Sequence, residues 1–171
     1  MKSTALISCL AVAILAAGCG GSHQAAATNA ATTSTVRTDP QQRLTAAVRE
    51  TVRANHRLAK LVLWRNAVPA SATRSTRGPA LAALRSAAAG RRRRGIHVKV
   101  VYDAFRITSV ALDPSFARAT AVVVDPQRVR PYGPDGKPLG KAVALSEKSR
   151  FVLRRVGGSE RFVVWQVAPV Q

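Results

Sequence analysis

The sequence predicts an α+β fold, in which two amino-terminal helices pack on one face of a curved antiparallel sheet of four to five strands. Two patterns predict it. Apolar residues recur at helical spacing between residues 39 and 89, and they alternate with polar residues from residue 96 onward. Short turns join the alternating segments, which favours antiparallel pairing. We expect residues 39–171 to form a single domain, preceded by a signal peptide and a tether.

The first 18 residues have the composition of a signal peptide. Lys2 supplies one positive charge, and the run from Ala5 to Ala17 is apolar apart from Ser8 and Cys9. The run is too short to cross a bilayer as a permanent helix, and the small residues that end it suit a cleavage site. We therefore expect this protein to be exported.

The stretch Leu15-Ala16-Ala17-Gly18-Cys19 resembles the lipobox of bacterial lipoproteins, although Leu15 lies one place further from the cysteine than is usual. The resemblance implies cleavage before Cys19, a diacylglyceryl group on its sulfur, and acylation (a palmitate, for example) of the new amino terminus. The thiolate is the nucleophile such a modification needs, and two or more acyl chains anchor a protein stably. The domain would then face the cell envelope, outside the cytoplasm of a bacterium. The alternative is an ordinary secretory signal with an incidental cysteine.

Residues 19–38 predict a flexible tether. They are mostly Ala, Thr, Ser, Asn and Gln, with no acidic residue and no large apolar residue before Val36. Such a segment has too little apolar surface to offset the entropy lost on ordering. A flexible chain of this length has a reach of about 25 Å. After cleavage Cys19 would be the only cysteine, so we expect no disulfide framework.

Two helices are predicted before residue 96. Asp39 can cap the first, Pro40 suits its first position, and the helical spacing extends to about Leu63. The apolar face of this helix comprises Leu44, Val48, Val52, Asn55, Ala59 and Val62. The second helix is expected over 79–89 and should end at Gly90, which leaves Arg91–Arg94 in a solvated loop.

The chain is strongly basic, with 27 Lys and Arg against 8 Asp and Glu and a net charge of +19. In an exported protein this charge favours anionic lipid or an envelope polymer or protein as partner, and we expect no nucleic-acid binding. The candidate contacts are a stripe on the back of the first helix and the arginine run, namely Arg49, Arg53, Arg57, Lys60, Arg91, Arg92, Arg93 and Arg94. Each such residue near an anionic leaflet contributes about 1 kcal/mol. The alternatives are simple solvation of this face and genomic bias towards arginine.

The alternating segments predict strands, separated by a turn at Asp113-Pro114-Ser115 and another at Gly157-Gly158-Ser159. A proline- and glycine-rich excursion is expected from Asp125 to Gly140. The predicted strands cover residues 96–102, 105–110, 116–124, 141–155 and 160–168.

The order of these elements resembles the cone-shaped superfamily of nuclear transport factor two and ketosteroid isomerase. The stretches that resemble it most are 105–110, 117–122, and the closing hairpin 151–158 with 162–167. The resemblance implies a pocket between the sheet and the helices, for which Asn55, Trp64, Tyr102 and Asp103 are candidates. Enzymes of the superfamily place an Asp, His or Tyr there. A cystatin-like fold and an unrelated sandwich are the alternatives.

The sequence carries no recognisable catalytic, metal-binding or cofactor motif. His56 and His97 are expected to be solvated, and Asp103 to lie in a turn or pair with Arg106. We therefore expect a lipid-anchored, extracytoplasmic accessory or binding domain without catalytic activity, whose basic surface faces an anionic membrane or an envelope partner. The alternative is a pocket that binds, or acts on, a small apolar ligand.

Overall fold

Two helices precede five strands along the chain, as predicted. A computed structural model describes residues 39–170, so the predicted signal peptide and tether lie outside the described residues. The two α-helices are α1 (Pro40–Arg65) and α2 (Gly78–Arg93), and the short 3-10 helix η1 (Ala70–Arg74) lies between them in the sequence. The strands are β1 (His97–Asp103), β2 (Arg106–Leu112), β3 (Arg118–Tyr132), β4 (Val143–Arg155) and β5 (Phe162–Pro169). No helix among residues 39–170 is both long and apolar enough to cross a membrane.

Helix α1 begins and ends as its sequence indicates. The Asp39 side chain accepts a hydrogen bond from the Gln41 backbone N–H at 3.0 Å. At the other end, Asn66 adopts the left-handed conformation, and its backbone N–H donates to the carbonyl of Val62. The predicted apolar face is buried, with Leu58 in place of Ala59, and consists of Leu44, Val48, Val52, Asn55, Leu58 and Val62.

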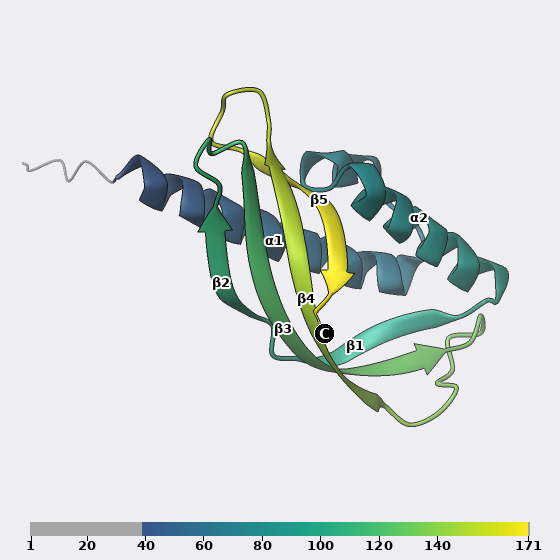
Figure 1. Cartoon of the computed structure of the whole chain (residues 1–171). Coiled ribbons are helices and arrows are strands. Elements are labelled where there is room, and N and C mark those ends of the chain that lie inside the picture. Colours follow the sequence, from purple (N-terminus) through teal and green to yellow (C-terminus); the bar gives the residue numbers. More distant parts are fainter. Residues whose placement is uncertain (1–38, 171) are drawn as a thin grey trace, which may run out of the picture. The chain divides into compact units, whose positions relative to one another are not determined.

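The sheet is organised around β3, which is long enough to pair with two strands along one edge. Its first half pairs with β2, its second half with β1, and its other edge pairs with β4, which in turn pairs with β5. All these pairs are antiparallel, as predicted. Bulges in β1, β2 and β5 add to the twist of the sheet. Figure 1 shows both helices on the same side of the sheet, while β2, β3 and β4 leave the other side uncovered.

The predicted excursion from Asp125 to Gly140 is wrong in its first half, because β3 continues to Tyr132. The Pro126 carbonyl accepts a hydrogen bond from Ala104, in the gap between β1 and β2. The nitrogen and carbonyl of a strand residue point to the same side, so the missing N–H of Pro126 also faces this gap. The ladder with β4 is therefore intact, and only residues 133–142 form the loop.

The predicted loop at Arg91–Arg94 is also wrong. Helix α2 continues through Gly90 to Arg93, and Arg94 is its C-cap. Positive charges at a helix carboxyl end interact favourably with the unpaired carbonyls and the helix dipole, which offsets the repulsion among the arginines. Gly95 follows with a φ of +65° and turns the chain towards β1.

The core consists of two groups of buried side chains on the helix-covered side of the sheet. Helix α1 contributes to both. The larger group joins its first half to the sheet and comprises Leu44, Val48, Val52, Ala80, Ala119, Ala121, Val123, Phe151, Leu153, Phe162 and Val164. The smaller group joins its second half to α2 and comprises Leu58, Val62, Ala72, Leu81 and Ala88.

Candidate functional site

A cleft of about 550 Å³ opens between the two helices and the helix-covered face of the sheet. Most of its lining is apolar. The lining residues come from α1, α2, the strands β3, β4 and β5, and the turn between β1 and β2. The apolar residues include Ala59, Ala80, Ala83, Leu84, Phe105, Val123 and Phe151, and the polar ones are Asn55, His56, Asp125, Gln127, Glu147, Ser149 and Gln166. A mostly apolar cleft with a few converging polar groups is the usual form of a small-molecule site.

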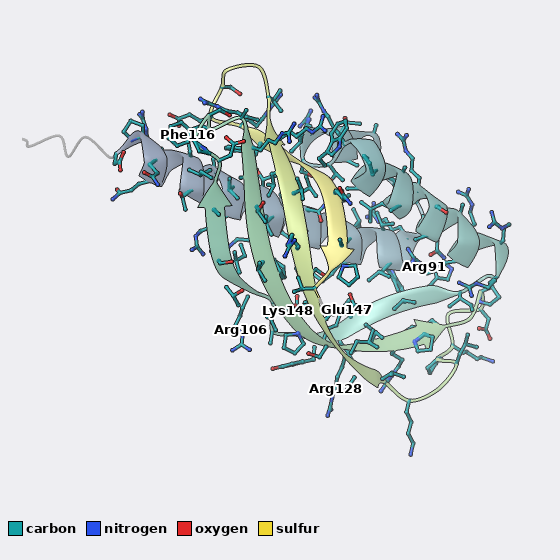
Figure 2. The ribbon with its side chains drawn as sticks, viewed as in Figure 1. Arg91, Arg106, Phe116, Arg128, Glu147 and Lys148 are labelled. Atoms are coloured by element: carbon teal, nitrogen blue, oxygen red, sulfur yellow. The ribbon has the colours of Figure 1, made fainter. Side chains whose placement is uncertain are left out.

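Strand alternation positions the polar groups from the sheet. In β3, Asp125 and Gln127 follow Val123 on the same face, and in β4 Glu147 and Ser149 precede Phe151. Asp125 and Glu147 are direct cross-strand partners, so their side chains project side by side into the cleft. Figure 2 labels Glu147 on β4, close to the point where β3 changes its pairing partner.

His56 lies between two carboxylates at the edge of this cleft. Its Nε2 is 2.9 Å from Asp103 Oδ2, and its Nδ1 is 3.6 Å from Asp125 Oδ2. The ring also stacks on Phe105, with 4.1 Å between centroids. The expectation that His56 is solvated is therefore wrong, because α1 crosses the sheet where β1 and β3 bring these two acids together.

Asp103 is held by three donors rather than by the predicted partner Arg106. Besides His56, the donors are Lys60 Nζ at 2.6 Å and the Phe105 backbone N–H at 3.1 Å. Burial by itself would raise the pKa of Asp103, but the hydrogen bonds outweigh it and hold the pKa well below its usual range. This carboxylate is therefore ionised throughout the neutral range.

Asp125 has the opposite environment. Its side chain is 17% exposed, and its Oδ1 atom is buried without a hydrogen-bond partner among the described residues. Burial raises the pKa of Asp125, and the nearby Asp103 and Glu147 raise it further, while His56 opposes the shift. Asp125 is thus a carboxylate whose negative charge the protein itself satisfies only in part.

Three residues of this cluster could offer ligand atoms to a metal ion. One atom each from His56, Asp103 and Asp125 lie within 4.8 Å of one another. However, Asp103 Oδ2 already accepts from both His56 and Lys60, so a metal ion would have to displace the ammonium group of Lys60. The chemistry of the donor set favours an internal ion-pair network. The expectation that the protein holds no metal stays a prediction.

Only one of the predicted pocket residues lines the cleft. Asn55 does so, and it is buried, with its amide donating to Thr76 Oγ1 at 2.7 Å. Asp103 lies behind His56, in a smaller hollow beside Arg53 and Arg57.

The two aromatic candidates lie elsewhere. Trp64 is 44% exposed and packs edge-on against Tyr132, beside a separate hollow near His97. The Nδ1 atom of His97 is 2.8 Å from the Trp64 carbonyl, so this histidine is not simply solvated. Tyr102 is 57% exposed and pairs with Arg128, whereas the neighbouring Asp103 pairs with Gln127, which lines the cleft. Tyr102 is thus on the opposite face of the sheet.

The predicted basic residues do not form one free surface. Arg57 pairs with Glu50 at 2.7 Å, and Lys60 with Asp103, while Arg49 and Arg53 continue the stripe on α1. The remaining candidates Arg92, Arg93 and Arg94 are exposed at the end of α2.

Arg91, by contrast, makes hydrogen bonds within the domain. Its Nε donates to Asn66 Oδ1 at 3.1 Å, and its terminal nitrogen donates to the Val62 carbonyl at 3.3 Å. Figure 2 shows Arg91 near the carboxyl end of α2. Burial lowers its pKa, as does the charge of Arg94, although arginine stays charged at any physiological pH. Arg91 therefore caps the end of α1 rather than offering a free charge to a surface.

A second basic surface, which we term the open sheet face, was not predicted from the sequence. It consists of exposed cations on the side of the sheet opposite the helices: Arg106, Arg118, Arg128, Lys148, Arg150 and Arg154. None of them is in an ion pair with a described residue. In Figure 2, Arg106 and Arg128 point away from the body of the domain. The cations on β3 and β4 all have even residue numbers, so strand alternation alone places those of each strand on one face. Which face the helices cover could not be read from the sequence.

No family model and no curated protein matches this sequence. Among solved structures, the domain is similar to the crystal structure of the intermembrane space region of the chloroplast protein ARC6. The TM-score is 0.62 at 10% sequence identity, and the match covers 74% of this chain and 95% of that one. At this identity the likeness shows the fold alone, an α+β arrangement of helices on an antiparallel sheet.

Proposed function

We propose that this protein is a lipid-anchored, extracytoplasmic binding domain without catalytic activity, held at a bacterial cell membrane with the open sheet face against anionic lipid. The observation that carries the proposal is the segregation of charge across the sheet. All acidic residues of the strands, namely Asp103, Asp125 and Glu147, are on the helix-covered face, and the open sheet face has basic ones.

The strand register brings like charges together on the open sheet face, which destabilises the fold unless a bound anion compensates them. Arg118 and Arg154 are directly opposed across β3 and β4, and like charges in that position repel. Arg150 is paired with Val122, and Lys148 with Val124, so half-buried valines lie between the cations. A surface of cations around a small apolar centre is complementary to phospholipid head groups, to which each cation contributes about 1 kcal/mol.

The open sheet face and the stripe on α1 cannot both contact one flat membrane. Helix α1 buries one side against the sheet, so Arg49 and Arg53 on its back point away from the open sheet face. A tether of about 25 Å from Cys19 would allow either surface to reach the lipid. The open sheet face is the stronger candidate because two members of the helix stripe are already neutralised by Glu50 and Asp103.

Vesicle co-sedimentation tests this proposal. Residues 37–171 suffice, because the described residues belong to that unit, and omission of Cys19 removes any lipid anchor. We expect binding to vesicles with anionic lipid at low salt, and none to neutral vesicles or at high salt. The triple variant Arg106→Gln/Lys148→Gln/Arg150→Gln should lose at least tenfold in binding.

The matched control is the triple variant Arg49→Gln/Arg53→Gln/Arg57→Gln, which removes the same charge from the back of α1. We expect it to bind within about threefold of the wild-type domain. Equal losses in both triple variants would contradict the assignment to the open sheet face, and absence of binding at low salt would exclude membrane contact through either surface. For the anchor, Cys19→Ser in the full chain should release the protein from the membrane fraction of a bacterial host.

The cleft supports a second function, the binding of a small and mostly apolar ligand. Its volume and lining are suited to such a ligand, and its place between helices and sheet is what the resemblance to the cone-shaped superfamily implies. We expect a neutral apolar fluorophore to gain emission on binding there. Ala83→Trp, which fills the cleft from α2, should abolish the gain, whereas Ala82→Trp, an exposed neighbour outside the lining, should not. Equal fluorescence in all three proteins would contradict this function.

A further inference from the structure

We propose that the ligand of the cleft carries a protonated amine, bound by Asp125 and Glu147 while the apolar lining holds its hydrocarbon body. This inference rests on the cleft being a ligand site, the second function proposed above.

The first observation is the position of the two acids on the sheet side of an open, largely apolar cleft, where Asp125 is half-buried and Glu147 is exposed. Asp125 and Glu147 are cross-strand partners, which in an antiparallel sheet sets their Cβ atoms about 5 Å apart. Both line the cleft, together with Val123 and Phe151 on the same face. Two like charges opposed in this way repel, and a cation between them would remove the repulsion.

The second observation is the incomplete satisfaction of Asp125. Its Oδ2 atom faces His56 at 3.6 Å, which is too long for a good hydrogen bond, and its Oδ1 has no partner among the described residues. Buried polar atoms in folded proteins almost always have a partner. The raised pKa of Asp125 agrees with this geometry. An ammonium group, with its three donors, supplies what the carboxylate lacks.

The neighbouring basic side chains do not fill this role. Lys60 and His56 both bond to Oδ2 of Asp103. Lys60 makes no ion pair with Asp125, and His56 approaches Asp125 only to 3.6 Å. The six cations of the open sheet face, Arg106 and Lys148 among them, project from the opposite face. The sheet therefore lies between the acids of the cleft and the cations of the open sheet face.

An organic amine fits better than a metal ion or an anion. The lining is mostly apolar, whereas a bare divalent cation prefers a shell of oxygen ligands and water. An anionic ligand would face Asp125 and Glu147 directly. Because the whole chain carries a net charge of +19, any preference for a cation must come from the local arrangement of these acids.

Competition among three probes with the same apolar cage tests the inference. The probes are 1-aminoadamantane, 1-adamantanol and adamantane-1-carboxylate, which are respectively positive, neutral and negative at pH 7. Each probe is titrated against a neutral fluorophore bound to the wild-type protein, and the ratio of their affinities is the readout. We expect the amine to bind at least tenfold more tightly than the alcohol, and the carboxylate to bind most weakly.

Variants of the two acids locate the preference. Asp125→Asn and Glu147→Gln should each lower the amine-to-alcohol ratio at least fivefold, while the affinity for the alcohol is kept, which shows that the cleft is still folded. Asp135→Asn, an exposed acid of the loop before β4, is the control and should leave the ratio unchanged.

The possible results separate this inference from the function on which it rests. Equal affinities for amine and alcohol would overturn the inference and leave the cleft as a site for neutral ligands. A preference for the amine that survives both substitutions would also overturn it. If none of the probes displaces the fluorophore, the ligand site itself fails, and the inference fails with it.

Discussion

Replacement of Asp103 by Asn removes the negative charge to which two side chains of α1 are bonded. In the wild-type protein, His56 and Lys60 both approach the Oδ2 atom, at 2.9 and 2.6 Å, and the Phe105 backbone N–H donates to Oδ1 at 3.1 Å. The amide oxygen of the Asn side chain can still accept from Phe105. The two charge-assisted bonds to α1 are lost or weakened, so the contact between this helix and the end of β1 loosens.

The magnitude follows from the exposure of the two partners. The side chain of His56 is largely buried, and a hydrogen bond to a charged group in such a place contributes about 2 kcal/mol. Lys60 is 36% exposed, so its ion pair contributes at most about 1 kcal/mol. We expect Asp103→Asn to lower the free energy of unfolding by about 2–3 kcal/mol at pH 7.

The same geometry determines the pH dependence. The hydrogen bonds hold the pKa of Asp103 below its value in the unfolded chain, so the carboxylate stabilises the fold above about pH 4 and loses this effect as the pH falls. The difference between variant and wild type should therefore be constant from pH 5 to 8 and shrink below pH 4. Urea unfolding at a series of pH values measures it, with Asp135→Asn as an exposed control.

Two results would refute this reasoning. A loss below about 0.5 kcal/mol at pH 7 would mean that the ion pairs contribute no more than typical surface pairs. A loss that stays constant down to pH 2 would mean that the substitution acts through packing and not through the charge of the carboxylate.

Further predictions concern the glycine at the start of α2 and the arginine that caps α1. Urea unfolding measures the stability of the variants in both cases. Gly78 and Gly136 have φ angles of +56° and +75°, but only at Gly78 would a Cβ atom lie 2.8 Å from the ring of Trp165. Gly136→Ala should lower the free energy of unfolding by about 1 kcal/mol through backbone strain alone. Gly78→Ala should lower it by at least about 1 kcal/mol more, because the new methyl group would also overlap the Trp165 ring. Equal losses in the two variants would show that α2 shifts away from the ring. Arg91→Lys should cost about 1–2 kcal/mol, since lysine cannot reproduce its two directed bonds, whereas Arg92→Lys should be neutral, and equal effects would contradict a capping role.

The periodic patterns were enough to predict most of the elements. Helix α1 has a cap at Asp39, a proline at its first position and a continuous apolar face, all of which are local properties. The turn at Asp113 is equally local, because its side chain accepts from Ser115 and from the Ala117 backbone N–H. A spacing of about 3.6 or 2 residues is visible without knowledge of what the face packs against, so the fold class could be predicted.

Two predictions about local structure failed because distant segments decide the outcome. Pro126 appeared to end a strand, but its nitrogen faces a gap that exists only because β1 and β2 share one edge of β3. Arg91 appeared to belong to a solvated run of like charges, yet it lies next to the end of α1 and bonds to Asn66 there. In both cases the local sequence is ambiguous, and the partner that resolves it is more than 20 residues away.

The sequence by itself determined the order of helices and strands, the strong positive charge, and the resemblance of the first 19 residues to a lipoprotein signal. Tertiary structure alone decided where the charges lie. His56 and Asp103 are 47 residues apart and meet only because α1 crosses the sheet at that point. Alternation in a strand assigns side chains to two faces, but the helices decide which face is covered, and thereby which charges line the cleft and which ones face outward.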